Sequence, residues 1–481
     1  MFEGIYQADY WISRYIIQRG MGLIYLIAFI TAFNQFRPLL GENGLMPVPE
    51  FLKNTTFKQF PGIFQWHYSD RLFGWVSGSG IFLSLLALFG FSDAGPIWLS
   101  MLIWLLLWAL YLSIVNAGQI FYGFGWESLL LEAGFYVIFL GPLHYYAPLI
   151  MIFILRWLVF RVEFGAGLIK MRGDKCWRNL TCLNYHHETQ PLPNPFSRFF
   201  HNLPESIHKF ETLSNHAVQL GVVWLLFAPQ PIASYAAVLI VLSQGYLIIS
   251  GNYAWLNLLT LLLAFSGFSD SFLQQILTIS PPAELASPVW FMGLSAALAA
   301  VVIYLSIDPV KNMISPAQRM NASFNNLHLV NTYGAFGSVT KERREIVVEG
   351  TTDEQIDEKT EWKPYEFKGK PTDPGRQPPQ VAPYHLRLDW QMWFAAMRDV
   401  RMCPWFIKFV KKLLQNQKSI AKLLKTNPFE MQKPTYIRAR LYIYRFTTPE
   451  EKRETGQWWH REYQHDYLPP KSLDDLSGLD L

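Results

Sequence analysis

The chain has 481 residues, of which 51% are hydrophobic, 16% aromatic and only 16% charged. Soluble proteins carry about 25% charged residues, so this composition indicates a membrane protein. The formal net charge of +4 is small, and the lysines and arginines are scattered along the chain. These features exclude the concentrated basic surface of a nucleic-acid-binding protein.

Nine stretches of the chain approach the length of a membrane-crossing helix. Such a helix needs about 20 mostly apolar residues, because each residue advances about 1.5 Å along its axis. Some stretches are short or interrupted by charge, so we expect a polytopic α-helical membrane protein with about seven to nine transmembrane helices. The stretches lie near residues 15–34, 72–92, 97–116, 126–142, 147–163, 214–228, 232–250, 254–275 and 288–307.

The composition changes abruptly after Asp308. Basic and acidic residues and proline become frequent, and no apolar window of membrane length follows. We therefore predict a multi-helix transmembrane domain over residues 1–307, with a polar loop at about residues 170–213. A soluble C-terminal domain is expected over residues 308–481.

The C-terminal region carries the period-two pattern of a β-strand. From Tyr436 to Phe446, apolar residues alternate with arginine and tyrosine, as expected for a half-buried strand. Residues 389–425 show helical spacing instead, with Trp390 and Trp393 on one apolar stripe. These patterns predict a β-rich domain that contains an inserted helical pair.

Three charged residues, Glu127, Glu132 and Arg156, fall inside predicted membrane helices. A charge at membrane depth costs about 2.5–3.5 kcal/mol on insertion scales unless it pairs or reaches water. We expect ion pairs that hold the helices together. The short connection between the helices that carry Glu132 and Arg156 makes these two residues expected neighbours. Arg14 or Arg19 on the first helix would then supply Glu127. A substrate pathway or a proton relay is the alternative role of these charges.

The polar loop contains side chains that are able to perform acid–base chemistry. His186, His187 and Glu188 form such a run, but three adjacent residues define no geometry. Lys170, where a helix leaves the membrane, could act as a base if it were buried. Extension of its ammonium group to the membrane interface is the simpler interpretation.

The three cysteines are too few for a disulfide framework. Cys176 and Cys182 could form one bridge in an oxidising compartment, and two unpaired thiols explain the sequence equally well. No spacing of histidine or cysteine in the loop resembles a zinc site. We therefore expect neither a metal nor a cofactor.

Several separated strings, beginning with Gly-Phe-Gly-Trp-Glu-Ser at residues 123–128, resemble the lipase maturation factor family of endoplasmic-reticulum membrane proteins. The resemblance spans nearly the whole chain. The matching strings cover residues 123–132, 165–182, 187–195, 209–216, 331–334, 388–396 and 456–459.

The resemblance implies a chaperone-like protein that assists the folding and assembly of secreted lipases through a loop and a C-terminal region facing the lumen. It assigns no catalytic chemistry, so a protein without enzymatic activity is the favoured interpretation. The implied partners are the lipid bilayer and partly folded clients such as secreted lipases, with no nucleic acid. The candidate client-binding or structural residues are Trp177, His187, Glu188, Trp390, Trp393, Trp458 and Trp459.

Two departures from the animal proteins suggest a short member of the family, which could be bacterial: an early first helix and no hydrophobic tail. The membrane would be that of the endoplasmic reticulum in a eukaryote and the cytoplasmic (inner) membrane in a bacterium. A weaker likeness, through residues 167–170, links the chain to the transmembrane domain of the vitamin K-dependent carboxylase type. It supplies an enzymatic alternative with Lys170 as the base, assisted by His186 or His187.

The sequence gives conflicting signals about orientation. With nine crossings, the basic loops 34–71 and 162–216 and the C-terminal domain would all lie on one side of the membrane. The excess of basic residues favours the cytoplasm for that side. The resemblance implies the lumen, and we follow it because long loops and domains obey the charge rule poorly.

Overall fold

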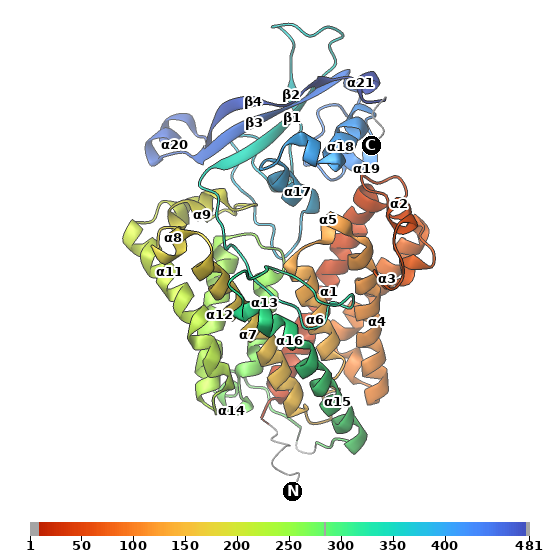
Figure 1. Cartoon of the computed structure of the whole chain (residues 1–481), viewed down its shortest axis with the longest axis vertical. Coiled ribbons are helices and arrows are strands. Elements are labelled where there is room, and N and C mark those ends of the chain that lie inside the picture. Colours follow the sequence, from red (N-terminus) through yellow and green to blue (C-terminus); the bar gives the residue numbers. More distant parts are fainter. Residues whose placement is uncertain (1–8, 283–284, 478–481) are drawn as a thin grey trace.

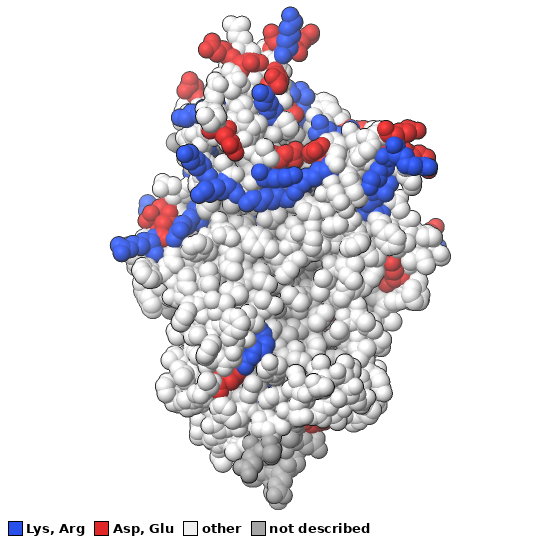
Figure 2. Space-filling view, turned by 180° about the vertical axis from the view of Figure 1, so that it is seen from behind, with Lys and Arg blue, Asp and Glu red and all other residues white. Residues whose placement is uncertain are grey.

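The computed structural model describes residues 9–282 and 285–477. Figure 1 shows a bundle of long helices that carries, at one end, the four-stranded sheet and the short helices of the C-terminal region. Figure 2 shows that charged side chains gather around this C-terminal end, whereas the visible surface of the bundle is nearly free of them. An uncharged surface of this kind is expected where lipid replaces water as the solvent.

Ten helices make up most of the bundle. They are α1 (Trp11–Leu40), α3 (Asp70–Leu88), α4 (Ile97–Ala117), α6 (Gly125–Val137), α7 (Leu149–Arg172), α11 (Glu205–Leu220), α12 (Ile232–Ser250), α13 (Leu256–Ala264), α15 (Val289–Leu305) and α16 (Ile307–Ile314). Helix α16 continues α15, and most of the ten helices are apolar because lipid or neighbouring helices surround them.

Within the described residues, five helical segments are long and apolar enough to cross a membrane, fewer than the seven to nine that the sequence predicts. They are α1, α3, α4, α12 and the continuous segment Val289–Ile314. Helix α7 has 24 residues but carries Arg156, Arg161 and Glu163 inside its apolar run. Helices α6 and α13 have only 13 and 9 residues. The charges in α7 and the short lengths of α6 and α13 therefore explain why fewer helices than predicted are long and apolar enough to cross a membrane.

Hydrogen bonds from α1 identify the two ends of the bundle. At the start of α1, the backbone amide of Trp11 donates to the Asp270 carboxylate over 2.9 Å. Near its other end, Gln35 Nε2 donates to the backbone oxygen of His385 in the C-terminal region over 2.7 Å. We call the end near His385 the domain-facing end and the end near Asp270 the far end.

Short helices cap both ends of the bundle and form its loops. They are α2 (Val48–Lys53), η2 (Ile63–Gln65), η3 (Phe91–Asp93), α5 (Gln119–Tyr122), α8 (Lys175–Arg178), α9 (Leu183–Thr189), α10 (Ser197–His201), η4 (Val222–Phe227), η5 (Phe265–Gly267) and α14 (Asp270–Leu273).

The C-terminal sheet is antiparallel, with strand order β2-β1-β3-β4. Strand β3 has the bounds that the sequence predicts, and its alternation of buried residues is interrupted near Tyr442, where its pairing with β4 shifts register. Such a bulge turns the following side chains to the other face. The strands are β1 (Arg343–Thr351), β2 (Lys363–Pro364), β3 (Tyr436–Phe446) and β4 (Trp459–Lys471).

The helices between β2 and β3 are more fragmented than the predicted pair. Asp399 caps one short turn and Pro404 starts the next helix, where its missing N–H has no cost. Asn416 then adopts a positive φ of 51°, which interrupts the helix. The elements are α17 (Arg387–Ala395), η6 (Val400–Met402), α18 (Pro404–Leu414) and α19 (Lys418–Ala421), and α20 (Pro449–Thr455) and α21 (Leu473–Ser477) follow later.

The chain between α16 and β1 returns to the helical bundle before it enters the sheet. Gln318 Nε2 donates to the backbone oxygen of Gly165 over 3.0 Å, and Asn331 and Tyr333 contact the buried Glu132. We call residues 318–337 the return segment. It places polar side chains of the C-terminal part of the chain among the bundle helices.

Candidate functional site

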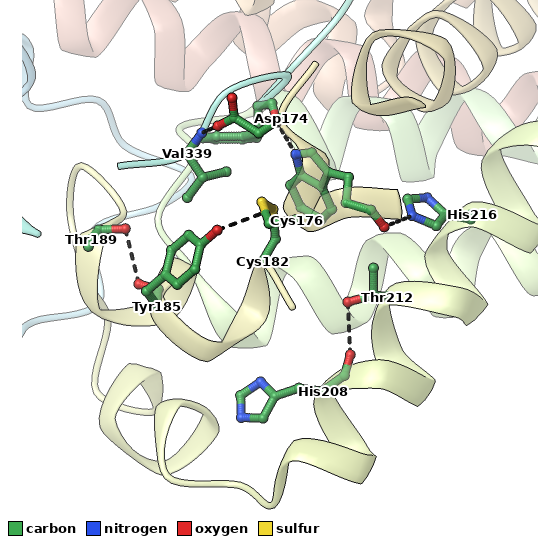
Figure 3. The surroundings of a disulfide bond; sticks show 11 residues. Asp174, Cys176, Cys182, Tyr185, Thr189, His208, Thr212, His216 and Val339 are labelled. Atoms are coloured by element: carbon green, nitrogen blue, oxygen red, sulfur yellow. Dashed lines mark hydrogen bonds between the residues drawn. A yellow bond between two sulfur atoms is a disulfide. The ribbon is translucent and has the colours of Figure 1, made fainter. Parts of the chain in front are cut away.

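The polar loop is folded around a disulfide bond at the domain-facing end. Cys176 and Cys182, at α8 and α9, are joined by this bond (Figure 3). Trp177 is buried, and its Nε1 donates to the backbone oxygen of Phe336 over 2.7 Å. The Asp174 carboxylate accepts from the backbone amide of Val339 over 2.9 Å. The loop therefore packs directly on the chain that leads into β1.

Helix α9 and the residues after it form a joint with the C-terminal sheet. The Glu188 carboxylate accepts from the backbone amide of Phe446 over 2.6 Å. Arg343 on β1 donates to three backbone oxygens of the loop. They belong to Glu188 (3.0 Å), Gln190 (2.5 Å) and Pro191 (3.1 Å). Sequence-distant parts of the chain thus form one continuous surface.

The joint is stabilised by a buried charge network. Glu345 pairs with Arg343 over 2.5 Å and with Lys370 over 2.9 Å, and all three side chains are buried. The guanidinium carbon of Arg343 also lies 5.4 Å from the ring centre of Trp459. The Glu345 carboxylate therefore lies between two cations, and one of these, Arg343, also contacts an aromatic ring. These contacts offset most of the cost of burying the three charges.

The candidate residues Trp458 and Trp459 pack against the C-terminal sheet. Trp459 is 0% exposed, because it stacks on Phe446 at 4.1 Å between ring centres and lies under Arg343. Trp458 is partly buried beneath the ammonium group of Lys452. Trp459 therefore belongs to the core of the sheet and Trp458 packs against that core, so neither is a freely exposed side chain.

Trp390 and Trp393 are also parts of the interface between bundle and sheet. Trp390 is buried against Trp126, with 4.9 Å between ring centres. Trp393 Nε1 donates to the backbone oxygen of Thr189 at the end of α9, over 3.2 Å. Both side chains hold helix α17 on the bundle and on the loop.

Glu127 pairs with the C-terminal region and not with α1. Its Oε1 lies 2.8 Å from Nη1 of Arg387, and Tyr111 donates to its other oxygen. The expected partners are engaged elsewhere: Arg14 donates to loop carbonyls at the far end, including that of Tyr145 (2.6 Å), and Arg19 pairs with Asp93. The expected pairing fails because α1 presents these arginines at the opposite end of the bundle.

Glu132 pairs with Arg161 and not with Arg156. Arg156 instead donates to the backbone oxygen of Ser266 over 2.9 Å, and its guanidinium lies over the ring of Tyr10. The two arginines are five positions apart on α7, so they point to different sides of the helix. The predicted acid is therefore paired, but by the arginine that the sequence reasoning did not consider.

Lys170 and His186 lie in one buried neighbourhood around Trp177. Lys170 Nζ donates to Asn215 Oδ1 over 2.7 Å and to Gln219 Oε1 over 3.0 Å, and it lies 5.0 Å from the ring centre of Trp177. His186 Nε2 is 3.0 Å from the hydroxyl of Tyr253. Lys170 thus donates to two amide oxygens, which is the arrangement of a structural hydrogen-bond donor.

Burial controls the ionisation of the loop and its surroundings. It lowers the pKa of His201 to about 4, and the neighbouring His208 and Arg198 act in the same direction. It raises the pKa of Glu188, although the amide of Phe446 and the charge of Arg343 oppose this.

In the C-terminal region, burial lowers the pKa of His385 to about 4, with Arg387 adding to the effect and Glu127 opposing it. Burial also raises the pKa of Asp389, which accepts the amides of Gly369 and Lys370. Burial therefore favours neutral imidazoles at His201 and His385.

Several residues of the joint carry no local signal in the sequence. Arg343, Lys370 and Arg387 are ordinary basic residues in a charged region, and only the fold buries them. Glu345 could have been noticed, because it stands in the strand-like run beginning at Arg343, where a buried acid needs a partner. One further group, His187, His208 and Glu211, brings together side chains that could hold a metal ion.

Comparison with known proteins places these features in a family. The profile of the lipase maturation factor transmembrane domain matches residues 12–275, and that of the lipase maturation factor C-terminal domain matches residues 329–469. No solved structure gives a significant match.

Relatives match along almost the whole chain. Lipase maturation factor 1 of Mus musculus is 41% identical over 98% of this chain and 89% of its own length, and that of Homo sapiens is 39% identical over 98% and 90%. Lipase maturation factor 2 of Homo sapiens is 30% identical over 96% and 83%. These vertebrate relatives give no support to a bacterial member or to a carboxylase-type likeness. The chain belongs to the lipase maturation factor family.

Proposed function

We propose that this chain is a membrane-embedded maturation factor that assists secreted lipases, or other exported proteins, to fold or assemble. The joint between α9 and the sheet carries the proposal, because Arg343 and Glu188 fasten a disulfide-bonded loop to the C-terminal region. A broad, rigid surface at one end of a membrane bundle suits a protein that holds partly folded clients. The names of the relatives identify lipases as the clients to test first.

The same arrangement favours an endoplasmic-reticulum membrane location, with the domain-facing end in the lumen. A disulfide at this end fits an oxidising compartment. Asn54, Asn179 and Asn321 start Asn-X-Ser/Thr sequences, and all three side chains are exposed. Glycans at Asn54 and Asn179, removable by an endoglycosidase and lost in Asn→Gln variants, would support this orientation, whereas absence of both would contradict it.

Cysteine labelling gives an independent test of orientation. Cys403 is only 3% exposed, so it is a poor target for a membrane-impermeant reagent. Met431, in the same C-terminal region, is 99% exposed. Met431→Cys should be labelled only after sealed microsomes are opened. Labelling of intact microsomes would place the region in the cytosol.

We infer nine passages through the bundle, in agreement with the upper end of the sequence expectation. Helices α6, α7 and α13, together with the continuous α11–η4 segment, run between the same two ends as the five long apolar helices (Figure 1). The charges of Glu132 on α6 and Arg161 on α7 point into the bundle, where they pair with each other. The proposed division between the two domains at residues 307 and 308 falls within the continuous segment Val289–Ile314, and the return segment that follows packs among the helices.

Exposed aromatic residues that could contact a client lie in the loop between α1 and α3. Trp66 is 77% exposed and stacks on Phe57, which is 48% exposed, with 5.6 Å between ring centres. Such rigid, partly apolar side chains are typical of contact residues. We expect Trp66→Ser with Phe57→Ser to reduce secreted lipase activity while the amount of this protein stays normal.

The decisive experiment measures lipase secretion in cells that lack their own family member. Active lipase should appear in the medium when this chain is supplied, and the ratio of lipase activity to lipase mass should fall with the Trp66 and Phe57 variant. Tyr463→Ser, an exposed aromatic change on β4, is the matched control. Failure of the wild-type chain to raise that ratio with every lipase tested would overturn the proposal.

The enzymatic alternative predicts a different outcome. If Lys170 were a base, Lys170→Met would abolish maturation without loss of protein. The two amide acceptors make Lys170 a structural donor, so we expect any loss of maturation in this variant to follow its loss of folded protein. Complete loss of activity at an unchanged level and thermal stability would favour the enzyme.

A further inference from the structure

Two histidines and a glutamate from different elements converge beside the disulfide-bonded loop. His187 belongs to α9, whereas His208 and Glu211 stand one turn apart on α11. Each residue offers one ligand atom, and these atoms all lie within 4.8 Å of one another. Figure 3 shows the His208 side chain projecting from its helix towards the side on which α9 lies.

Each member of the group has a buried polar atom that lacks a hydrogen-bond partner among the described residues. These atoms are His187 Nε2, His208 Nδ1 and Glu211 Oε2. Buried polar atoms in native proteins are almost always paired with protein, water or an ion. The three residues with these atoms are the same three whose possible ligand atoms lie close together, which indicates a shared ligand, with the Tyr246 hydroxyl as a neighbour of Glu211.

The types of donor select the kind of ion. Two imidazoles and one carboxylate form a donor set that Zn²⁺ prefers, whereas Ca²⁺ and Mg²⁺ favour oxygen ligands alone. Zinc ligand bonds are about 2.0–2.2 Å long, which puts ligand atoms of a tetrahedral site about 3.3 Å apart. Modest rotations of the side chains would bring the three atoms from their present separations to that distance.

The surroundings also suit an ordered metal site. The ring of His187 stacks on Phe200, with 5.5 Å between ring centres, and Phe200 packs against Tyr246 at 5.3 Å. His187 and His208 are only 3% and 2% exposed. Buried imidazoles with aromatic walls lose little entropy when they bind an ion, because packing already limits their rotamers.

We propose that His187, His208 and Glu211 bind one Zn²⁺ ion that joins α9 to α11. The next residue on α9, Glu188, accepts the amide of Phe446, so the ion would anchor the joint to the bundle. The ligands come from two separate helices, which is why no zinc-type spacing is visible in the sequence. We expected no metal from the sequence because the three ligands are not close together along the chain.

The test uses the full chain, purified in detergent, stripped with a chelator and dialysed against a defined amount of Zn²⁺. We expect about one bound zinc per chain by mass spectrometry of the metal, and a higher unfolding temperature with zinc than without it. Co²⁺ in place of zinc should give the visible absorption of a tetrahedral site with nitrogen and oxygen ligands.

Glu211→Gln is the sharpest variant, because it keeps the shape of a partly exposed side chain while it removes the anionic ligand. Zinc affinity should fall at least 10-fold in this variant and in His208→Gln, and the thermal shift should disappear. Glu205→Gln, on the exposed part of the same helix, and His67→Gln, an exposed loop residue, should bind as the wild type does. Absence of zinc from the folded wild type, or unchanged binding in both ligand variants, would overturn the proposal.

Discussion

Glu127 and Glu132 lie on the same short helix, α6, yet they are satisfied in different ways. Glu132 accepts six hydrogen bonds: two from Arg161, two from Asn331 and one each from Tyr136 and Tyr333. Glu127 accepts from Tyr111 and pairs with Arg387, while Nδ1 of His385 stays 3.8 Å from its oxygen.

The difference continues in the partners of Glu127. Within the described chain, both ring nitrogens of His385, and Nε and Nη2 of Arg387, are buried without a hydrogen-bond partner. Arg387 is held instead by the backbone oxygen of Phe121, over 2.6 Å, and by the ring of Tyr122, whose centre is 3.4 Å from the guanidinium carbon. Glu132 thus belongs to a dense network and Glu127 to a sparse one, although Arg161 Nε and Asn331 Oδ1 in the dense network also lack a partner among the described residues.

A dense network fixes one geometry, because any movement breaks several bonds at once. At Glu127, fewer bonds would break if the contact between α17 and the bundle changed. We therefore assign Glu132 to permanent attachment of the return segment. Glu127 marks the part of the junction that is easier to loosen.

The largest effect should follow from Glu132→Gln. Its amide group would face donors from Arg161 and Asn331, and Arg161 would lose its countercharge. Loss of one partner of a buried pair costs about 3–5 kcal/mol, so the yield and the unfolding temperature in detergent should fall sharply. Glu205→Gln is the exposed control, and equal stability of the two variants would contradict the assignment.

Glu127→Gln should cost less, about 2 kcal/mol. Arg387 keeps its carbonyl and aromatic contacts, and the new amide can still accept from it. Unfolding temperatures of the Glu127→Gln and Glu132→Gln chains, measured side by side, test the order. A greater loss in Glu127→Gln would reverse the comparison.

Acidification should weaken the junction through His385. Its pKa is about 4 in the folded chain against an ordinary value of 6.5, so the unfolded state takes up the proton first. Stability is therefore retained above about pH 6.5 and lost as the pH falls from there towards 4. The loss from this residue between pH 7.5 and 5.5 should be about 1.4 kcal/mol.

The measurement compares thermal unfolding at the two pH values in the wild type and in His385→Gln. The variant should lose less stability on acidification than the wild type. His67→Gln, at an exposed position, should leave the pH dependence unchanged. An identical pH dependence in His385→Gln would show that the pKa of His385 does not differ between the folded and the unfolded chain.

The smallest effect should come from Tyr333→Phe, which removes one neutral donor from Glu132. A single hydrogen bond of this kind contributes about 1 kcal/mol. Because five other bonds remain, the unfolding temperature should fall slightly and lipase maturation should persist. A loss as large as that of Glu132→Gln would mean that the hydroxyl organises the entire network.

The sequence predicted the features that depend on local pattern. Strand β3 followed from the alternation between Tyr436 and Phe446, and the need for paired acids at Glu127 and Glu132 followed from the cost of burying charge. The family resemblance rested on strings spread along nearly the whole chain, one of which contains both acids, and both matching profiles confirm it. The number of long apolar helices was overestimated, because α6 and α13 are shorter than the apolar stretches that contain them and α7 carries three charged residues inside its apolar run.

The partners of those residues depended on tertiary structure. Arg387, Arg161 and the return segment are distant from α6 in sequence, and no periodicity relates an acid to an arginine on another element. The burial of Trp459 also depended on tertiary structure. An aromatic residue at the start of a strand can face either water or the core, and the pairing of β3 with β4 places Trp459 in the core. Local sequence specified which groups required burial or pairing, whereas the packing of distant segments determined which groups met, because contact is a property of the folded chain.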